Sequence, residues 1–388
     1  MMRYHAVVIG AGLVGTACAL ALEKIGLQIA LIEPCLPPEP TSIWDTRIYA
    51  ISPGSQCLLE GLGVWQQLDG ERIQPVYRME VHGDEYGTIT LDSYDSGVER
   101  LATILESNRL QSALWQVAKE ATHLDIISPA RIKSMRMQRS QSHLVLEDGR
   151  ELESGLIIGA DGRDSWVRSQ AGIQPVIEPY GQLGVVANFE VEKPHQGTAF
   201  QWFRHDGVLA WLPLPGKRMS MVWSTSEEHG RELLALDANA LCDKVAAAGD
   251  GRLGKLSLLT AAAGFPLRLM KLPEICQPGL VLVGDAAHGV HPLSGQGVNL
   301  GFGDVESLAD ILAKRGRADC GDMRVLARHA RARTEPVLRM QAVTDNLHHL
   351  FTRQGKLSGT LRNSGMSLLN RLPFAKATLV REALAITN

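Results

Sequence analysis

Three glycines near the start of the chain, Gly10, Gly12 and Gly15, have the G-x-G-x-x-G spacing of a dinucleotide-binding turn. A short apolar run precedes them and an Ala/Leu-rich segment follows, which is the strand–turn–helix context that this pattern requires. Glycines are needed there because the backbone turns tightly and must approach a pyrophosphate closely. The phosphates then meet free N–H groups at the helix N-terminus. Glu33, at the end of a second apolar run, can accept hydrogen bonds from a ribose.

A second glycine-rich segment, residues 159–163 (GADGR), directly follows another apolar run. Its Asp161 can form hydrogen bonds with a ribose or with a neighbouring backbone, and Arg168 can face a phosphate. An Asp-Gly pair is also common in ordinary turns. Taken alone, this segment is therefore compatible with a purely structural turn as well as with a nucleotide site.

A third segment, residues 284–299 (GDAAHGVHPLSGQGVN), again follows an apolar run. Asp285 can accept hydrogen bonds from the hydroxyls of a ribityl chain. The turn at Gly295–Gly297 opens a helix, whose N-terminal amides and positive dipole end favour a nearby anion such as a reduced flavin ring. His288 and His291 could instead be metal ligands, but the surrounding glycines and the lack of a third clustered ligand argue against this reading. We expect no metal.

In this order, the three segments resemble the motifs of the FAD-dependent aromatic hydroxylases of the para-hydroxybenzoate hydroxylase type, the class A flavoprotein monooxygenases. The resemblance covers most of the chain. Within this family, the ubiquinone-biosynthesis hydroxylases are the most similar in residues 45–47 (DTR), 50–52 (AIS), 210–215 (AWLPLP), 291–301 and the tail from Asn346 to Ala383. Tryptophan halogenases share the scaffold but carry a Trp-x-Trp-x-x-Pro element. Trp211 lacks the paired tryptophan, so halogenation is disfavoured.

The resemblance implies a role for each matching residue. The FAD-binding residues are Gly10, Gly12, Gly15 and Glu33 for the adenosine diphosphate, Arg47 and Arg109 for the flavin, Asp161 for FAD and NAD(P)H handling, Asp285 for the ribityl chain and pyrophosphate, and Pro292, Gly295, Gly297, Val298 and Asn299 for the loop against the isoalloxazine ring. The candidates for contact with the substrate or the transferred oxygen are His291, Pro292 and Gln296. On residue type alone, both arginines could instead form surface salt bridges.

The resemblance also implies the reaction. NADPH or NADH would reduce the FAD as a transient electron donor, and one atom of O2 would enter the aromatic ring of a polyprenylated phenol in ubiquinone biosynthesis. The chain has no second dinucleotide fingerprint, which agrees with a nicotinamide that binds only transiently. Two alternatives stay open: a flavin-dependent reductase of a prenyl substrate, which would consume no O2, and a flavin-bound organiser of a quinone-biosynthesis complex.

The charge is unevenly distributed along the chain. The segment from Lys314 to Asn388 has 14 Lys and Arg against 5 Asp and Glu, whereas the rest has 25 against 37. A basic tail on an acidic body indicates contact with an anionic membrane surface through residues 346–383. A solvated helical face, or a contact with other quinone-biosynthesis proteins, would give the same pattern. No nucleic-acid partner is expected.

The six cysteines are scattered and form no C-x-x-C pair, so neither a zinc site nor a disulfide framework is predicted. The sequence shows no signal-peptide pattern and no apolar run of the roughly 18–20 residues that a membrane span needs. These features predict a cytoplasmic protein, which would lie on the inner face of the cell membrane if its tail binds lipid.

Positioning the three glycine segments requires a strand before each of them, and the sequence supplies one each time. We therefore predict an α/β protein with a Rossmann-like FAD-binding domain assembled from separated segments, an inserted antiparallel β-sheet substrate domain and a helical C-terminal tail. The predicted bounds are 1–74, 101–178 and 269–330 for the first domain, 75–100 and 179–268 for the second, and 331–388 for the tail. The clearest local predictions are helices over 13–25, 106–120 and 238–248, and a hairpin over 142–158 turning at Asp148-Gly149.

Overall fold

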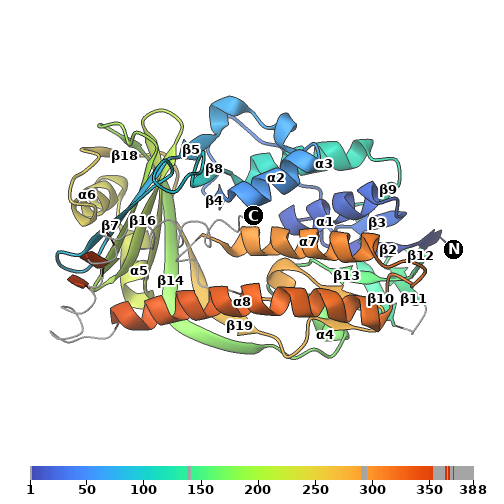
Figure 1. Cartoon of the computed structure of the whole chain (residues 1–388). Coiled ribbons are helices and arrows are strands. Elements are labelled where there is room, and N and C mark those ends of the chain that lie inside the picture. Colours follow the sequence, from blue (N-terminus) through green and yellow to red (C-terminus); the bar gives the residue numbers. More distant parts are fainter. Residues whose placement is uncertain are drawn as a thin grey trace.

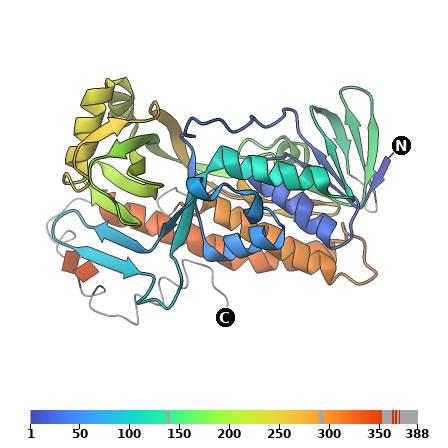
Figure 2. The same cartoon turned by 90° about the horizontal axis from the view of Figure 1, so that it is seen from above.

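The computed structural model describes residues 2–137, 141–289, 295–352, 363, 364, 366, 367 and 370. This part of the chain forms four β-sheets with helices packed around them (Figure 1). The eight-stranded sheet lies at one end of the molecule and the six-stranded sheet lies towards the other, with the long helix α8 (Met323–Thr352) running alongside both (Figure 2).

The six-stranded sheet has the order β20-β21-β13-β2-β3-β9. Its strands are β2 (Ala6–Ile9), β3 (Ile29–Ile32), β9 (Leu124–Ile127), β13 (Ile157–Gly159), β20 (Cys276–Gln277) and β21 (Leu280–Leu282). All pairs are parallel except β20–β21. The central strands are apolar throughout because both faces of the sheet are covered. Since β2, β13 and β21 are neighbours, the three glycine segments that follow them meet at one edge.

Helices cover one face of this sheet and a second sheet covers the other. The first face carries α1 (Leu13–Lys24), α3 (Ser107–Glu120) and α7 (Gly297–Ala313), whose apolar residues form one core. The α1–α7 contact is close, because a side chain on Gly301 would come within 2.6 Å of Val14 Cγ2. The other face packs against α4 (Trp166–Gln170) and a sheet of β1 (Met2–Tyr4), β10 (Ile132–Arg136), β11 (Ser142–Leu146) and β12 (Glu151–Ser154).

The eight-stranded sheet is built from two separated parts of the chain. Its strands are β6 (Arg78–His82), β7 (Thr88–Asp92), β14 (Val176–Val191), β15 (Thr198–Arg204), β16 (Gly207–Leu214), β17 (Arg218–Ser226), β18 (Leu256–Leu258) and β19 (Ala263–Lys271). One face packs Phe189, Trp211 and Trp223 near α5 (Glu227–Ala235) and α6 (Ala238–Ala248). The sheet is antiparallel, as predicted, except for the β6–β15 pair, which is parallel.

A small three-stranded sheet joins the two larger parts. It consists of β4 (Ile48–Ile51), β8 (Ala102–Glu106) and β5 (Gln74–Val76). In the chain, α2 (Pro53–Gly61) and the short helices η1 (Trp65–Gln67) and η2 (Gly70–Arg72) lie between β4 and β5. Its apolar residues pack with Ala199 and Leu214 of the eight-stranded sheet. The sequence analysis did not predict this sheet, although it determines how the two parts meet.

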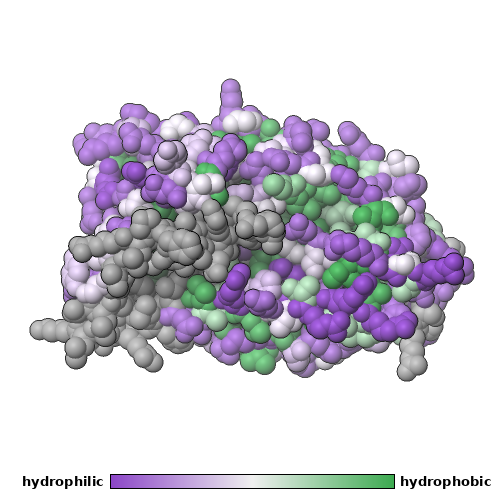
Figure 3. All heavy atoms as spheres, in the orientation of Figure 1, coloured by the Kyte–Doolittle hydropathy of each residue, from purple (hydrophilic) through white to green (hydrophobic). Residues whose placement is uncertain are grey.

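Helix α8 is anchored by polar residues on its buried side. His329 is fully buried and its Nδ1 lies 3.1 Å from Ser307 Oγ of α7, and burial lowers the pKa of His329 to about 4. Gln341 donates hydrogen bonds to the carbonyls of Met270 (3.0 Å) and Gly289 (3.1 Å). The visible face of the molecule mixes polar and apolar residues (Figure 3). Among the described residues, no helix is long and apolar enough to cross a membrane.

The strongest local predictions are confirmed. The predicted helices over 13–25, 106–120 and 238–248 appear as α1, α3 and α6, and β11 and β12 form the predicted hairpin with Gly149 at a φ of +88°. The predicted strands before the three glycine segments are β2, β13 and β21. The domain bounds stay a prediction, and most of the tail after Thr352 lies outside the described residues.

Candidate functional site

The first glycine turn lies directly against the second. Gly10 has a φ of +97°, and a side chain there would come within 2.5 Å of the carbonyl oxygen of Ala160. A side chain on Gly15 would overlap the carbonyl oxygen of Gly10. A side chain on Gly12, at the start of α1, would meet no protein atom within 4 Å. Gly10 and Gly15 are thus required by the fold itself, whereas Gly12 borders open space at a helix N-terminus, where a phosphate fits.

Glu33 lies at the carboxyl end of β3 and fixes this turn. Its carboxylate accepts hydrogen bonds from the backbone N–H of Ala11 (2.7 Å) and of Cys35 (3.3 Å). A carboxylate has about four acceptor positions, so two are left for another donor. The side chain is half-buried beside the open space at Gly12. This placement is compatible with the predicted ribose contact.

The second segment is more structural than its sequence indicated. Asp161 accepts hydrogen bonds from Oγ of Ser165, the N-cap residue of α4, and from the backbone N–H of Val167 (3.0 Å), and so it supports the start of α4. Arg168 is buried and donates to the carbonyls of Ala286 (3.0 Å) and Arg163 (2.9 Å). The expectation that Arg168 faces a phosphate is therefore wrong. Its guanidinium instead ties the second glycine segment to the third.

In the third segment, one polar side chain is exposed on an otherwise buried stretch of the loop. Asp285 is exposed, whereas Gly284, Ala286, Ala287 and His288 around it are buried. Within the described part of the chain, the Asp285 carboxylate has no hydrogen-bond partner. It follows β21 at the same sheet edge as Gly12, which follows β2. A free carboxylate at this edge can accept hydrogen bonds from a bound sugar or ribityl hydroxyl.

A buried ionic cluster holds this loop from beneath. Asp304 of α7 accepts the backbone N–H of Gly284 (2.9 Å), lies 2.6 Å from His288 Nε2 and receives Arg333 Nε of α8 at 2.6 Å. Burial opposes ionisation of Asp304, but the charges of His288 and Arg333 and the Gly284 amide outweigh it and hold the pKa of Asp304 well below its usual range. The Asp304 carboxylate is therefore ionised and fully paired.

The geometry does not support the alternative that His288 and His291 are metal ligands. His288 is committed to Asp304, and His291 lies outside the described residues. In the described ranges, no three His, Cys, Asp or Glu side chains gather as metal ligands would.

The start of α7 is fastened to the three-stranded sheet. Asn299 donates to the carbonyl of Ala50 (2.8 Å) and to Gln296 Oε1 (2.9 Å), and it accepts the backbone N–H of Ser52 (3.0 Å). A side chain on Gly295, whose φ is +61°, would approach Ala50 Cβ at 3.9 Å. Gly295, Gln296, Gly297, Val298 and Asn299 thus lie beside β4, while His291 and Pro292 fall outside the described residues.

The two arginines named from the sequence have different surroundings. Arg109 pairs with the buried Glu106 (2.9 Å) and donates to the carbonyl of Thr41 (3.0 Å), as the salt-bridge alternative expected. Glu106 also receives Arg72 at 2.8 Å. Arg47 is exposed and directly precedes β4, which lies beside the start of α7. The structure therefore leaves Arg47 accessible to a ligand and engages Arg109 in the protein.

Tyr49 lies near the candidate site and was not named in the sequence analysis. It lies on β4 between Arg47 and Ala50, and burial raises the pKa of its phenol, with Arg47 lowering it and Asp285 raising it. The charges of Arg47 and Asp285 therefore both act on the Tyr49 phenol. Its position two residues after Arg47 is the only sequence signal, because the proximity to Asp285 arises through folding.

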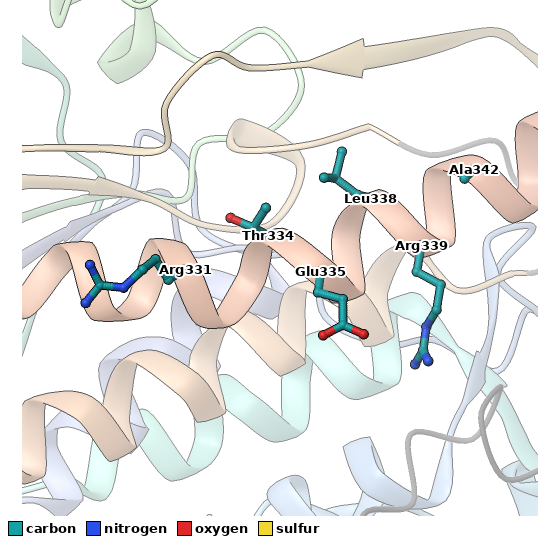
Figure 4. Close-up of a pocket in the computed structure, with 6 residues that line it drawn as sticks. All are labelled: Arg331, Thr334, Glu335, Leu338, Arg339 and Ala342. Carbon is teal, nitrogen blue, oxygen red and sulfur yellow. The ribbon is translucent and has the colours of Figure 1, made fainter.

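A separate surface cavity of about 620 Å³ does not belong to this site. Its lining residues form one stripe along α8 (Figure 4): Arg331, Thr334, Glu335, Leu338, Arg339 and Ala342. None of them belongs to the glycine segments or to the loop at the start of α7. We therefore place the candidate site at the edge of the six-stranded sheet.

The comparisons with known proteins show that the chain belongs to a family of FAD-binding proteins. A family model described as "FAD binding domain" matches residues 3–343. The chain is 33% identical to the 3-demethoxyubiquinol 3-hydroxylase of Escherichia coli, with 98% of each chain covered. It is 30% identical to the mitochondrial ubiquinone biosynthesis monooxygenase COQ6 of Drosophila melanogaster, covering 98% of this chain and 90% of that one.

Solved structures show the same fold. A probable FAD-dependent monooxygenase of Pseudomonas aeruginosa, PqsL, superimposes with a TM-score of 0.78 at 21% identity, covering 94% of this chain and 99% of that one. The p-nitrophenol 4-monooxygenase of Pseudomonas putida gives a TM-score of 0.81 at 15% identity over the full length of both chains. At these identities the likeness concerns the fold alone.

Replacing Gly12 by leucine tests the nucleotide turn. The φ of Gly12 is −69° and its surroundings are open, so Gly12→Leu should fold normally, yet the new side chain would occupy the space predicted for the pyrophosphate. We expect the purified variant to carry little FAD, measured by absorbance and by release of the flavin, which should be FAD and not FMN. Gly61→Leu, at an exposed and equally open glycine, is the control. Wild-type FAD content in Gly12→Leu would contradict the assignment.

Replacing Asp285 by alanine tests the third segment. A charge-assisted hydrogen bond contributes about 1.5–3 kcal/mol, so Asp285→Ala should weaken FAD binding by roughly ten- to a hundredfold. Fluorescence titration of the apoprotein measures this affinity. Asp310→Ala, which removes an exposed aspartate of α7 paired with Lys314, should leave it unchanged. An unchanged FAD affinity in Asp285→Ala would make Asp285 a structural residue.

Proposed function

Because the chain belongs to the family with this FAD-binding domain and is an FAD-dependent monooxygenase, we propose that it hydroxylates the aromatic ring of a polyprenylated phenol in ubiquinone biosynthesis. The observation that carries the proposal is the convergence of Gly12, Asp285 and the start of α7 at one edge of the six-stranded sheet. Relatives named for ubiquinone ring hydroxylation, which align over 98% of this chain, support the substrate class.

The residues at this edge fit FAD part by part. Gly12 and the α1 N-terminus would receive the pyrophosphate, Glu33 the adenosine ribose, and Asp285 the ribityl hydroxyls. The N-terminus of α7 would lie against the ring, where its positive dipole end favours negative charge on the reduced flavin. Arg47 adds a positive charge at the same place, with Tyr49 beside it. Asp161 would act indirectly, by supporting the start of α4.

When bound, FAD supplies the redox chemistry: it accepts a hydride from NADH or NADPH and reacts with O2, one atom of which enters the substrate ring. The protein's task is to orient the ring and to exclude water. An electron-rich phenol needs no metal for this step. His291, Pro292 and Gln296 are proposed to contact the substrate or the transferred oxygen, and the Gln296 side chain is positioned by Asn299.

Oxygen consumption tests the reaction. With NADH or NADPH and a short-chain demethoxyubiquinol, the purified protein should consume O2 and form a product that is heavier by one oxygen atom, derived from labelled O2. A prenyl reductase would add two hydrogens to the substrate without O2 uptake, and a non-catalytic organiser would oxidise no NAD(P)H above background. Either result would exclude the hydroxylase proposal. In a strain that lacks the protein, the accumulated precursor identifies the ring carbon.

We further propose that the basic tail brings the protein to a membrane, where a polyprenylated substrate resides. Apolar and basic residues alternate through 346–383, and each basic residue near an anionic surface contributes about 1 kcal/mol. The described tail residues include Asn363, which is fully buried, and Met366, which is 9% exposed. These two pack on the protein body, so membrane contact would involve other residues of the tail. Contact with other quinone-biosynthesis proteins is the alternative.

Flotation with liposomes tests this contact. Full-length protein should float with vesicles containing anionic phospholipid at low salt, and changing Arg362, Arg371 and Lys376 together to glutamate should abolish flotation. These three residues lie outside the described ranges. The matched control changes the three basic residues Arg136, Arg150 and Lys255, far from the tail in sequence, to glutamate. Failure of the wild type to float, or equal flotation of the tail variant, would contradict membrane binding.

A further inference from the structure

Strand β7 forms one edge of the eight-stranded sheet. An edge strand presents backbone N–H and C=O groups that can pair with a strand of another molecule, and the usual protections are a very short strand, charged side chains such as lysine, proline or a β-bulge. Residues 88–92 (TITLD) contain no lysine or proline, and they pair with β6 without a register shift. Their β-branched residues favour strand pairing. The edge of β7 therefore needs a protection from outside the strand.

Other sheet edges of the protein carry the usual protections. Strand β18, at the opposite end of the same sheet, has only three residues, and so has β1 at one edge of the four-stranded sheet. Strand β10, at the other edge of the four-stranded sheet, has the exposed basic residues Lys133 and Arg136 and a register shift between Ile132 and Ser134. Compared with these strands, β7 is long, regular and lacks basic side chains.

Residues near the C-terminus lie against this edge (Figures 1 and 2). Asn363 is fully buried at the turn between β6 and β7. Its Oδ1 accepts the backbone N–H of Gly87 (2.8 Å), and its Nδ2 donates to Asp84 Oδ1 (2.8 Å). A side chain on Gly83 or on Gly87 would come within 2.7 Å of Asn363 Oδ1. The two glycines of the turn thus leave the space that this amide occupies.

A second asparagine binds further along the same strand. Asn370 Oδ1 accepts the backbone N–H of Thr90 at 3.1 Å. In an antiparallel pair, alternate N–H groups point away from the partner strand, so a further strand would otherwise accept this hydrogen bond. Asn363 and Asn370 are both helical, and seven residues of α-helix rise about 10.5 Å. The three residues of extended chain from Gly87 to Thr90 span about 10 Å, so the two amides match the spacing of the edge.

We propose that Asn363 and Asn370, which we call the edge cap, occupy the outer edge of β7 in place of a further strand and keep a second copy of the chain from pairing there. A side-chain carboxamide has the same donor and acceptor groups as a peptide bond, so it satisfies a strand edge without extending the sheet. Without the edge cap, β7 of one copy pairs with β7 of another copy about a twofold axis, because such a contact uses the same surface on both copies.

Replacing both asparagines by alanine in the full-length, FAD-bound protein removes the edge cap. We expect the Asn363→Ala/Asn370→Ala variant to reach twice the mass of the wild type as the protein concentration rises, measured by light scattering after size exclusion. In dilute solution, the Thr90 amide should exchange its hydrogen about tenfold faster than in the wild type, because its acceptor is lost. Asn239→Ala, at an exposed asparagine of α6, is the matched control and should change neither measurement.

Gly87→Ala displaces the edge cap from the other side of the contact. The φ of Gly87 lies outside the left-handed region, so an alanine can adopt its backbone conformation. The new Cβ would lie 2.8 Å from Asn363 Cα, so the C-terminal residues must move away from the turn. We expect this variant also to double in mass and to keep its FAD. Gly70→Ala, at an exposed glycine with no atom within 4 Å of an added Cβ, is its control.

Thr90→Pro separates edge pairing from non-specific aggregation. Proline has no N–H group, and an edge strand tolerates it where the N–H points away from the sheet, as that of Thr90 does. Added to the double-alanine variant, Thr90→Pro removes a donor that the second copy needs. It should therefore restore the wild-type mass.

Three results would overturn the proposal. The first is the wild-type mass at every concentration in both the double-alanine variant and Gly87→Ala. The second is association that Thr90→Pro does not reverse, because the contact would then lie elsewhere. The third is loss of bound FAD with a lowered melting temperature in both variants, which would make the C-terminal residues part of the folded core and not a removable edge cap.

Discussion

The buried carboxylate of Asp304 is the interaction on which the site depends most. It connects α7, on which it lies, with α8 through Arg333 and with the third glycine segment through His288 and the Gly284 amide. Removing one partner of such a buried pair typically costs about 3–5 kcal/mol, because the remaining charge stays buried and unpaired. The exposed carboxylate of Asp285 is therefore carried by a loop whose position is fixed from below.

Other long-range contacts fix the same loop from the sides. Arg168 reaches the Ala286 carbonyl from α4, and Gln341 reaches the Gly289 carbonyl from α8. These donors come from segments more than fifty residues away in the sequence, and two of the three anchors, Arg333 and Gln341, lie on α8. The long helix beside the nucleotide-binding sheet therefore helps to hold this loop in place. It supplies hydrogen bonds that the loop cannot make for itself, and among the described residues of the loop the Asp285 side chain is left free for a ligand.

The sequence predicted the parts of the site that depend on local geometry. Gly10 and Gly15 were identified because only glycine tolerates such close backbone contacts, and the strands before the glycine segments were apparent from apolar runs. The pairing of Asp304 with His288, the inward turn of Arg168 and the position of Tyr49 could not be predicted, because they depend on contacts between distant segments. The small sheet of β4, β5 and β8 was missed for the same reason, since its strands pair only after folding.

Asp285 differs from the buried charged residues of this fold. Asp304, Glu106 and Arg168 are all paired within the protein, whereas the exposed carboxylate of Asp285 has no partner among the described residues. An ionised carboxylate offers about four acceptor positions, so an exposed Asp285 can receive hydrogen bonds from a bound ligand.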